Sequence, residues 1–421
     1  MPIVTPFKAI RPNKEAAPKF CALPYDVYNR KEACEIVKDN PLSFLSIDRA
    51  ETSFSDDTDT YAPEVYEKAR ELLNSRINDG TLIRDEKPCF YIYELTMDGR
   101  SQSGIVACSS IDDYQNSIIK KHENTREEKE IDRINHVDVT NAHTGPIFLV
   151  LRSVKELKDI VASYKTDEKM LYDFTSDDGI RHRAFIIDDD QVISRIEQIF
   201  SEIPCTYIAD GHHRCASAVK VGLKRRAASS NKEGSSDTGS LKGYERFLSV
   251  IFPDDELMIM PYNRVVKDLN GMSREAFIDA INKAGFKTDT GSDTPVNPSK
   301  KAEFGMFLDD KWYKLTARED LLSTDPVKGL DVSILQDNLL KPILGIDDPR
   351  TDKRIDFVGG IRGLGELEKR CHEDMKVAFS MYPTSITELL NVADAGLLMP
   401  PKSTWFEPKL RSGMFIHSLD D

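Results

Sequence analysis

The chain has 421 residues, of which 40% are hydrophobic and 30% are charged, and its net charge is −14. This composition is typical of a soluble globular protein, and the length predicts two or three domains. The acidic balance argues against a nucleic-acid-binding protein, because such proteins need a basic face to neutralise phosphates. It leaves room for a local basic pocket that binds a small phosphorylated ligand.

Targeting signals and the cysteine pattern indicate the cellular compartment. No apolar run approaches the roughly 18–20 residues of a membrane span, and residues 1–8 lack the apolar segment of a signal peptide. The seven cysteines are scattered and form no Cys-x-x-Cys pair. This pattern predicts free thiols in a reducing compartment and argues against a zinc site built from cysteines. We therefore expect a cytoplasmic protein with neither a membrane nor a nucleic-acid partner.

The first predicted elements surround a proline-containing turn. Apolar spacing predicts a helix over residues 30–39 and a strand over Leu42–Ile47, because Asn40 precedes a proline and ends the helix. Asp26 lies in the preceding turn, and together with residues 43–49 it could line a pocket. The alternative is that Asp26 is an ordinary turn residue.

A hairpin and a charged motif follow. Strands are predicted over 88–95 and 103–109 around an Asp-Gly turn. Farther on, charged groups gather at an expected strand end before a charged helix, and they are Lys121, His122, Glu123 and Arg126. They could be the solvated face of that helix. We favour a functional role, in which Lys121 and Arg126 hold phosphate and Glu123 acts on a hydroxyl proton or a metal.

His143 stands in the next motif, Asn141-Ala-His-Thr-Gly-Pro146, directly before an apolar strand over 147–151. The Gly-Pro turn and the strand would hold the imidazole near the edge of a sheet. A phosphate-binding role and a purely structural role are equally supported for this histidine.

The most informative stretch is a turn between a short strand, 205–209, and a helix that begins with small residues. Within five residues it offers a carboxylate, a glycine, two imidazoles and a guanidinium, which are Asp210, Gly211, His212, His213 and Arg214. Such a turn directs backbone N–H groups at one point, where the helix dipole favours an anion. Asp210 could hold a divalent metal or accept a proton, and Arg214 could grip phosphate oxygens with its two-pronged guanidinium. The alternative is an Asp-Gly turn with surface histidines and a salt-bridged arginine.

The second half begins after residues 227–240, a Ser/Gly-rich stretch that predicts a flexible linker. The glycine-rich stretch Gly359–Gly365 lacks the spacing of a known phosphate loop. Near the end, a proline-rich tail places a lysine beside two hydroxyls, Lys402, Ser403 and Thr404, and later Lys409. This tail suits either phosphate binding or docking as a terminal strand.

The five residues Asp210–Arg214 resemble the signature of free serine kinases of the ParB/sulfiredoxin-like superfamily. The whole chain resembles the family known as domain of unknown function 1015. Four further stretches carry this second resemblance, namely Leu23–Val27, Lys121–Thr125, Asn141–Pro146 and Met399–Lys409. The resemblance implies a ParB/sulfiredoxin-like catalytic region over 1–226, the linker over 227–240, and a second α+β lobe over 241–421 whose tail returns to the site.

Hairpins mixed with strand–helix alternation predict an α+β fold with mixed sheets. We expect a phosphotransferase that acts on a small hydroxyl metabolite, with free serine as the first candidate and phosphoserine as the product. The phosphoryl donor would be ATP, ADP or pyrophosphate. By the resemblance, Asp210, His212 and His213 act in catalysis, Asp210 binds Mg²⁺, and Gly211 and Arg214 bind phosphate. Residue chemistry makes Glu123 the second carboxylate.

Other functions remain open. A phosphoserine phosphatase could use the same site. The chain could also be a ParB-like nucleotide-binding or regulatory module, or a sensor of a phosphorylated metabolite. A small molecule is the expected partner, and an oligomer, if one forms, is expected to be a dimer.

Overall fold

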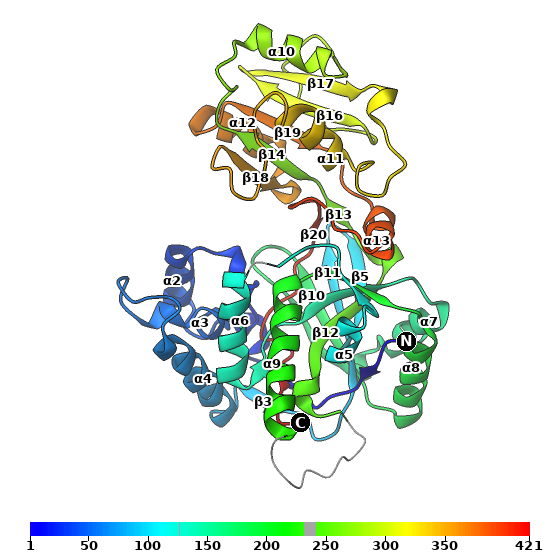
Figure 1. Cartoon of the computed structure of the whole chain (residues 1–421). Coiled ribbons are helices and arrows are strands. Elements are labelled where there is room, and N and C mark those ends of the chain that lie inside the picture. The colour runs from blue at the N-terminus through cyan, green and yellow to red at the C-terminus, as the bar shows by residue number, and fades with distance from the viewer. Residues whose placement is uncertain (126, 231–240) are drawn as a thin grey trace. The chain divides into compact units, whose positions relative to one another are not determined.

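The computed structural model describes residues 1–125, 127–230 and 241–421, and these form two compact units (Figure 1). The first unit contains residues 1–257 and 408–421, and the second contains 258–407. Each unit combines helices with β-sheet, so the predicted α+β class is confirmed.

The main sheet of the first unit has nine described strands. They are β1 (Val4–Thr5), β4 (Phe90–Met97), β5 (Arg100–Ser110), β6 (Ile119–Lys120), β8 (Ile147–Leu151), β9 (Met170–Thr175), β10 (Arg181–Ile187), β11 (Thr206–Asp210) and β12 (Arg246–Pro253). Their order is β6-β11-β8-β12-β5-β4-β10-β9, and β1 pairs with β5. The pairs β6/β11 and β8/β12 are parallel and the remaining pairs are antiparallel, so the sheet is mixed as predicted.

The boundary between the units lies later in the chain than the predicted start of the second lobe at residue 241. Strand β12 is hydrogen-bonded between β5 and β8, which places it inside the first sheet. Of the predicted linker, residues 227–230 belong to helix α9 (His212–Ser230), and residues 231–240 lie outside the described part of the chain.

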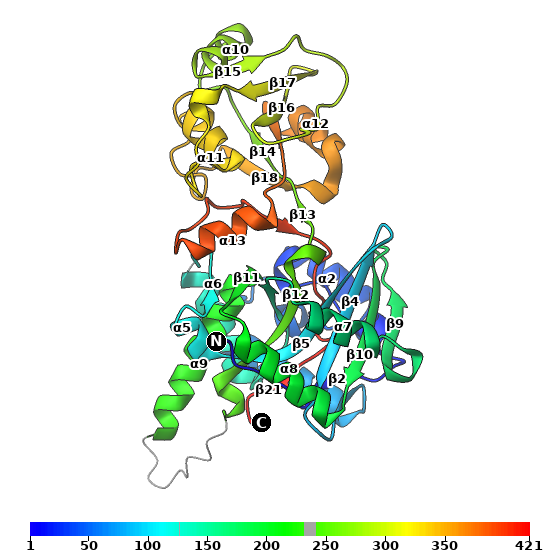
Figure 2. The ribbon, with the colours of Figure 1, turned by 90° about the vertical axis from the view of Figure 1, so that its right-hand side faces the viewer.

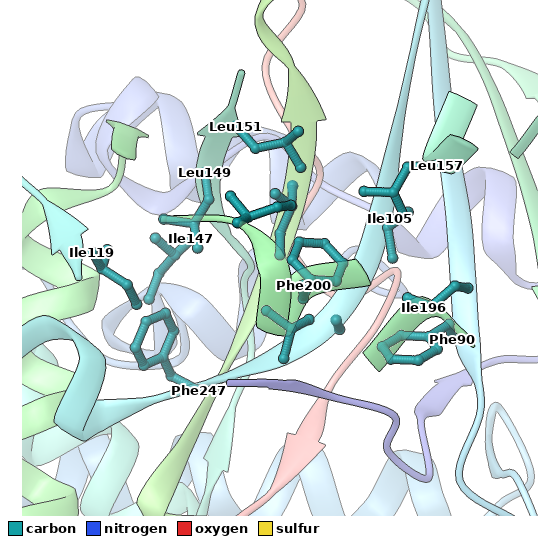
Figure 3. Close-up of a cluster of buried hydrophobic side chains, with 14 of the residues drawn as sticks. Phe90, Ile105, Ile119, Ile147, Leu149, Leu151, Leu157, Ile196, Phe200 and Phe247 are labelled. Atoms are coloured by element: carbon teal, nitrogen blue, oxygen red, sulfur yellow. The ribbon is translucent and has the colours of Figure 1, made fainter. Parts of the chain in front are cut away.

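Helices α7 (Lys155–Tyr164) and α8 (Asp190–Glu202) lie on one face of this sheet (Figure 2), and α9 adds Cys215, Ala218 and Val219 to the same core. Their apolar side chains pack against strand residues in a continuous core (Figure 3). Phe200 of α8 is fully buried there with Phe90 of β4. Most side chains of β4 and β5 are buried on one face of the sheet or the other, including polar ones such as Glu94 and Gln102.

A helical layer forms a second hydrophobic cluster in the same unit. It includes α2 (Arg30–Asp39), α3 (Leu45–Asp48) and α4 (Pro63–Asn78), and α6 (Glu127–Thr140) packs against both α4 and α9. The strand predicted over Leu42–Ile47 is wrong, because its end forms helix α3. Phe44 and Ile47 lie three residues apart and both enter this cluster, a spacing that suits one face of a helix.

The smaller elements of the first unit connect these layers. They are α1 (Ala17–Phe20), α5 (Ile111–Gln115), the pair β2 (Ile10–Pro12) and β3 (Leu82–Arg84), and the pair β7 (Ala142–His143) and β21 (His417–Ser418). The β7/β21 pair ties the C-terminal segment to the motif at residues 141–146.

The second unit is built on a six-stranded antiparallel sheet of order β15-β17-β16-β19-β14-β18. The strands are β14 (Tyr262–Val266), β15 (Phe286–Thr288), β16 (Glu303–Leu308), β17 (Lys311–Ala317), β18 (Ile355–Gly359) and β19 (Val377–Met381). Its helices are α10 (Arg274–Lys283), α11 (Asp331–Leu335), α12 (Gly363–Glu373) and α13 (Ile386–Asp394). A separate pair joins β13 (Ile259–Met260) to β20 (Trp405–Phe406). Within the described ranges of both units, no helix has the length and apolar character needed to cross a membrane.

Candidate functional site

The candidate site lies where two neighbouring strands of the first unit end. Strands β6 and β11 are parallel, with Thr206 opposite Ile119. Because the carboxyl ends of parallel strands meet at one edge of a sheet, the residues after β6 and those after β11 come together. The two strongest sequence motifs, 121–125 and 210–214, therefore meet at this edge.

Asp210 ends β11 and is held by a lysine from the C-terminal segment. Lys409 Nζ donates to Asp210 Oδ2 at 2.8 Å, and the backbone N–H of Gly211 donates to Oδ1 at 2.9 Å. Burial raises the pKa of Asp210, but Lys409 and the N–H of Gly211 outweigh it and lower the pKa to about 2. Gly211 has φ +88°, a conformation that favours glycine, and α9 begins at the next residue. The turn thus presents an ionised carboxylate at the N-terminus of a helix.

Arg214 lies in the first turn of α9 and faces buried acidic and aromatic groups. Its Nη2 donates to Ser412 Oγ at 3.2 Å and lies 3.9 Å from Asp48 Oδ2. Its guanidinium carbon is 5.5 Å from the ring centre of Tyr25. A side-chain carbon added to Gly145 would collide with the guanidinium, so the glycine of the 141–146 motif makes room for Arg214.

Two buried imidazoles and a carboxylate form a compact cluster at the same edge. The rings of His122 and His212 are perpendicular with centres 4.5 Å apart, and His212 Nδ1 lies 4.0 Å from Glu123 Oε2. One possible ligand atom from each of the three residues lies within 4.8 Å of the others, so the cluster could hold a metal ion. Burial lowers the pKa of His122 to about 4 and that of His212 well below its usual value, which makes both imidazoles neutral near pH 7.

The first unit contains a polar cavity of about 240 Å³ near Arg214. Tyr25 and Asp48 line this cavity and also lie beside the guanidinium of Arg214. Its wall carries groups of both charges, among them Asp26, Asp48, Arg49, Asp132 and Arg133. Arg133 stacks on the ring of Tyr25 at 3.9 Å. Burial raises the pKa of Asp48, but the nearby Arg214 and His136 outweigh it and lower the pKa. Of the residues expected to line a pocket here, Asp26, Asp48 and Arg49 line this cavity, and residues 43–47 do not.

A second cavity, of about 290 Å³, lies between α7 and the main sheet. Most of its wall is apolar, for example Leu151, Leu157 and Ile251, and none of the five sequence motifs contributes to it. The polar cavity is lined by one motif, Leu23–Val27, through Tyr25 and Asp26, and Arg214 lies against its wall at Tyr25 and Asp48.

Other predicted site residues lie at varying places in the first unit. Lys121 is exposed, with its ammonium 6.0 Å from the ring centre of Tyr114, and His213 is half-buried in the first turn of α9. His143 is buried in β7, where its ring stacks on His417 at 5.8 Å. Arg126 lies outside the described residues. The phosphate-binding roles of these side chains remain predictions.

The predicted phosphate ligands of the tail divide between the two units. Lys402, Ser403 and Thr404 belong to the second unit, where Lys402 lies over the ring of Tyr262 at 5.4 Å and the backbone of Ser403 accepts a bond from Thr384. Their part in the site stays a prediction. The tail residues that contact the motif are Lys409 and Ser412, which belong to the first unit.

Sequence reasoning missed several buried charged residues of the cavity wall. Asp132, Arg133 and His136 are at most 9% exposed, and Asp48, which is 4% exposed, was named only within residues 43–49. Asp132 and Arg133 lie in the charged helix that follows the 121–125 motif, and no role in a site was predicted for them. The available signal was the placement of Asp48 directly after an apolar run, which is unusual for a carboxylate on a surface.

Comparison with known families now adds to this geometry. A family profile described as "Protein of unknown function (DUF1015)" matches residues 4–333, which is more than half of the chain. The chain belongs to the DUF1015 family. No curated protein matches it.

Three solved structures are similar to this DUF1015 chain at low sequence identity. A conserved hypothetical protein from Pyrococcus furiosus is 16% identical with a TM-score of 0.33, and the match covers 75% of this chain and 95% of that one. A free serine kinase in complex with AMP is 14% identical with a TM-score of 0.34, covering 74% and 91%. SbnI with a C-terminal truncation, from Staphylococcus aureus, is 10% identical with a TM-score of 0.39, covering 74% and 87%. Similarity at this level leaves the function to be argued from the site.

Proposed function

We propose that the protein is a phosphotransferase that moves a phosphoryl group to a small hydroxyl-bearing metabolite, with free serine as the first candidate acceptor. The observation that carries the proposal is the turn at Asp210, where an ionised carboxylate, Lys409 and Arg214 meet at the start of α9. Phosphoryl transfer depends on positioning and on positive charge around the phosphate oxygens, together with a carboxylate near the attacking hydroxyl.

The polar cavity supports an amino acid as the acceptor. A free α-amino acid carries an ammonium and a carboxylate, and the cavity wall offers buried groups of both signs, Asp48 and Arg133. A volume of about 240 Å³ is sufficient for a molecule of the size of serine. Arg214 contacts both Asp48 and Tyr25 of this wall, so it links the cavity to the phosphate-binding turn.

Each group has a defined part in the reaction. The serine hydroxyl would lose its proton to Asp210 or Glu123, and its oxygen would bond to the terminal phosphorus of ATP, ADP or pyrophosphate. The bond from that phosphorus to the leaving ADP, AMP or phosphate would break. Arg214, His213 and the N-terminus of α9 would hold the phosphate oxygens. Asp210 is half-exposed and offers the carboxylate oxygen that Mg²⁺ prefers. When bound, Mg²⁺ would neutralise charge on the phosphates.

A phosphorus NMR time course on the full chain with Mg²⁺ tests the proposal. Separate samples would contain L-serine with ATP, ADP or pyrophosphate, and phosphoserine alone. We expect a phosphoserine signal from one donor, and we expect Asp210→Ala to lower its rate by at least about 1,000-fold, because the variant removes a group at the reacting centre. Asp293→Ala would be the carboxylate control, because Asp293 is 86% exposed in the second unit, where it pairs with Lys311.

Each other result has a definite meaning. Phosphate released from phosphoserine alone would replace the kinase by a phosphatase at the same site. Binding of serine or a nucleotide without turnover in every sample would favour the sensor or regulatory module. Silence in all samples, with no binding, would contradict the serine assignment.

A further inference from the structure

The cluster of His122, Glu123 and His212 has a feature that the proposed reaction does not explain. The side chains of His122 and His212 are only 2% and 6% exposed, yet His122 Nδ1 and His212 Nε2 are buried without a hydrogen-bond partner in the described structure. Buried polar atoms nearly always have a partner, so each exception requires an explanation such as an ion. Two such atoms in rings whose centres are 4.5 Å apart point to one shared ligand.

The hydrogen bonding of His122 prepares it to donate a lone pair. Its ring donates to the backbone carbonyl of Ile208, and because Nδ1 has no partner, the donor is Nε2. This bond fixes the proton on Nε2 and leaves the lone pair on Nδ1. Histidines that bind metals typically donate their other ring N–H to a carbonyl or carboxylate in this way, which fixes the tautomer and the ring orientation.

We propose that His122, Glu123 and His212 form a binding site for a divalent transition-metal ion of the zinc class. Two imidazole nitrogens and one carboxylate oxygen form a donor set that suits Zn²⁺ or its neighbours, whereas Mg²⁺ prefers oxygen ligands alone. The site is separate from the Mg²⁺ site expected at Asp210.

The geometry needs only a small adjustment. Around a tetrahedral ion with bonds of about 2.0–2.1 Å, donor atoms lie roughly 3.3–3.5 Å apart. One ligand atom from each of the three residues already lies within 4.8 Å of the others, and His212 Nδ1 lies 4.0 Å from Glu123 Oε2. Glu123 would bind through one oxygen, which leaves the other oxygen available for the hydroxyl proton in the proposed reaction. Metal binding itself does not depend on that reaction.

Equilibrium dialysis of the full chain against Zn²⁺, after removal of metals with a chelator, tests the inference. We expect one Zn²⁺ per chain by elemental analysis, not displaced by an about 100-fold excess of Mg²⁺. Substitution by Co²⁺ should give the visible absorption of a nitrogen-liganded ion. His122→Ala and His212→Ala should each weaken Zn²⁺ binding by at least about tenfold, and Glu123→Gln should also weaken it.

His372→Ala is the matched control, because His372 is an exposed histidine that lies 2.7 Å from the carboxylate of Asp310 in the second unit. It should leave Zn²⁺ binding unchanged. Thermal melts would show whether each variant is folded, and if a histidine variant fails to fold, Glu123→Gln replaces it, because Glu123 is half-exposed and the change keeps both imidazoles.

Three results would overturn the inference. The first is the absence of stoichiometric Zn²⁺ binding by the folded wild-type chain. The second is equal binding by wild type and the folded cluster variants. The third is metal-free binding of inorganic phosphate that is lost in the same variants, which would make the cluster an anion site. Because none of these measurements requires turnover, failure of the serine kinase proposal would leave the metal result intact.

Discussion

Two turns in this protein have the same local design and different surroundings. In the first unit, β11 leads through Gly211 into α9, and in the second unit, β18 leads through a 3-10 turn, Gly360–Arg362, into α12. In each, a short strand is followed by a glycine and then by a helix. Each also has an arginine near the start of its helix, Arg214 in the first and Arg362 in the second. On backbone grounds alone, each is a candidate for anion binding.

The neighbours of the two turns separate them. Arg214 is mostly buried and lies against Ser412 and Asp48, whereas the Arg362 side chain is 68% exposed, with Glu366 of its own helix 3.7 Å away. The glycines of the second turn have a packing explanation, because a side-chain carbon on Gly359 would lie 2.7 Å from the Trp405 ring. A glycine-rich strand-to-helix turn therefore indicates function only when other segments bring charged groups to it.

The largest expected difference between the two turns is in kcat/KM when their arginines are replaced. Arg214→Lys keeps the positive charge but loses the two-pronged guanidinium, so kcat/KM for phosphoryl transfer should fall about 10–100-fold. Arg362→Lys should leave kcat/KM unchanged. Steady-state kinetics with the donor identified by NMR measures both. Equal loss in the two variants, or loss in Arg362→Lys alone, would move the anion site to the second turn.

Replacing a glycine near each turn should change kcat/KM less than replacing its arginine. Gly145→Ala would push the guanidinium of Arg214 out of its place, and we expect an about tenfold lower kcat/KM with little change in stability, because the obstructing atoms belong to the end of a long side chain. Gly365→Ala is the matched change, since no atom lies within 4 Å of its added carbon. Normal kinetics in Gly145→Ala would show that the position of Arg214 does not matter for the reaction.

Much of the fold was accessible from the sequence because its signals were local. The hairpin around Asp98 and Gly99 follows from an Asp-Gly turn between apolar runs, and both residues have positive φ. The run at Leu42–Ile47 was interpreted incorrectly because six residues contain too few periods to distinguish a helix from a strand. Strand β12 was assigned to the wrong unit because its partners, β5 and β8, are distant in sequence.

The motifs of the candidate site were predicted from the sequence, but the contacts that bring them together were not. Asp210 and Glu123 were recognised by residue type, while the parallel pairing of β6 with β11 that joins them is a property of the sheet. Lys409 was noted in the tail, but its bond to Asp210 spans 199 residues of sequence. Asp48 was named only within residues 43–49, and its pairing with Arg214 is, like the other connections, a property of the fold.

The smallest effect on activity, and the last test, concerns one buried carboxyl group in each unit, away from both turns. Burial raises the pKa of Asp113 in the first unit and of Asp331 in the second to about 6. Their backbone partners are the N–H groups of Ile3, at 2.6 Å, and Ala302, at 3.0 Å. The folded state therefore binds each proton more tightly than the unfolded chain, and the free energy of unfolding should fall as pH rises from about 4 to about 6.

Asn cannot ionise and its side-chain oxygen can still accept the bond from Ile3, so Asp113→Asn should raise the free energy of unfolding by about 1–3 kcal/mol at pH 7 and flatten its decline between pH 4 and 6. Asp331→Asn should gain less, because Ala302 donates to both carboxylate oxygens, at 3.0 and 3.1 Å, and an amide offers only one acceptor. Urea unfolding at several pH values, with hydrogen exchange to assign each effect to its unit, measures both. Kinetics should be unchanged in both variants, and a loss of activity in Asp113→Asn would mean that the anion-binding turn depends on parts of the first unit beyond the residues that contact it.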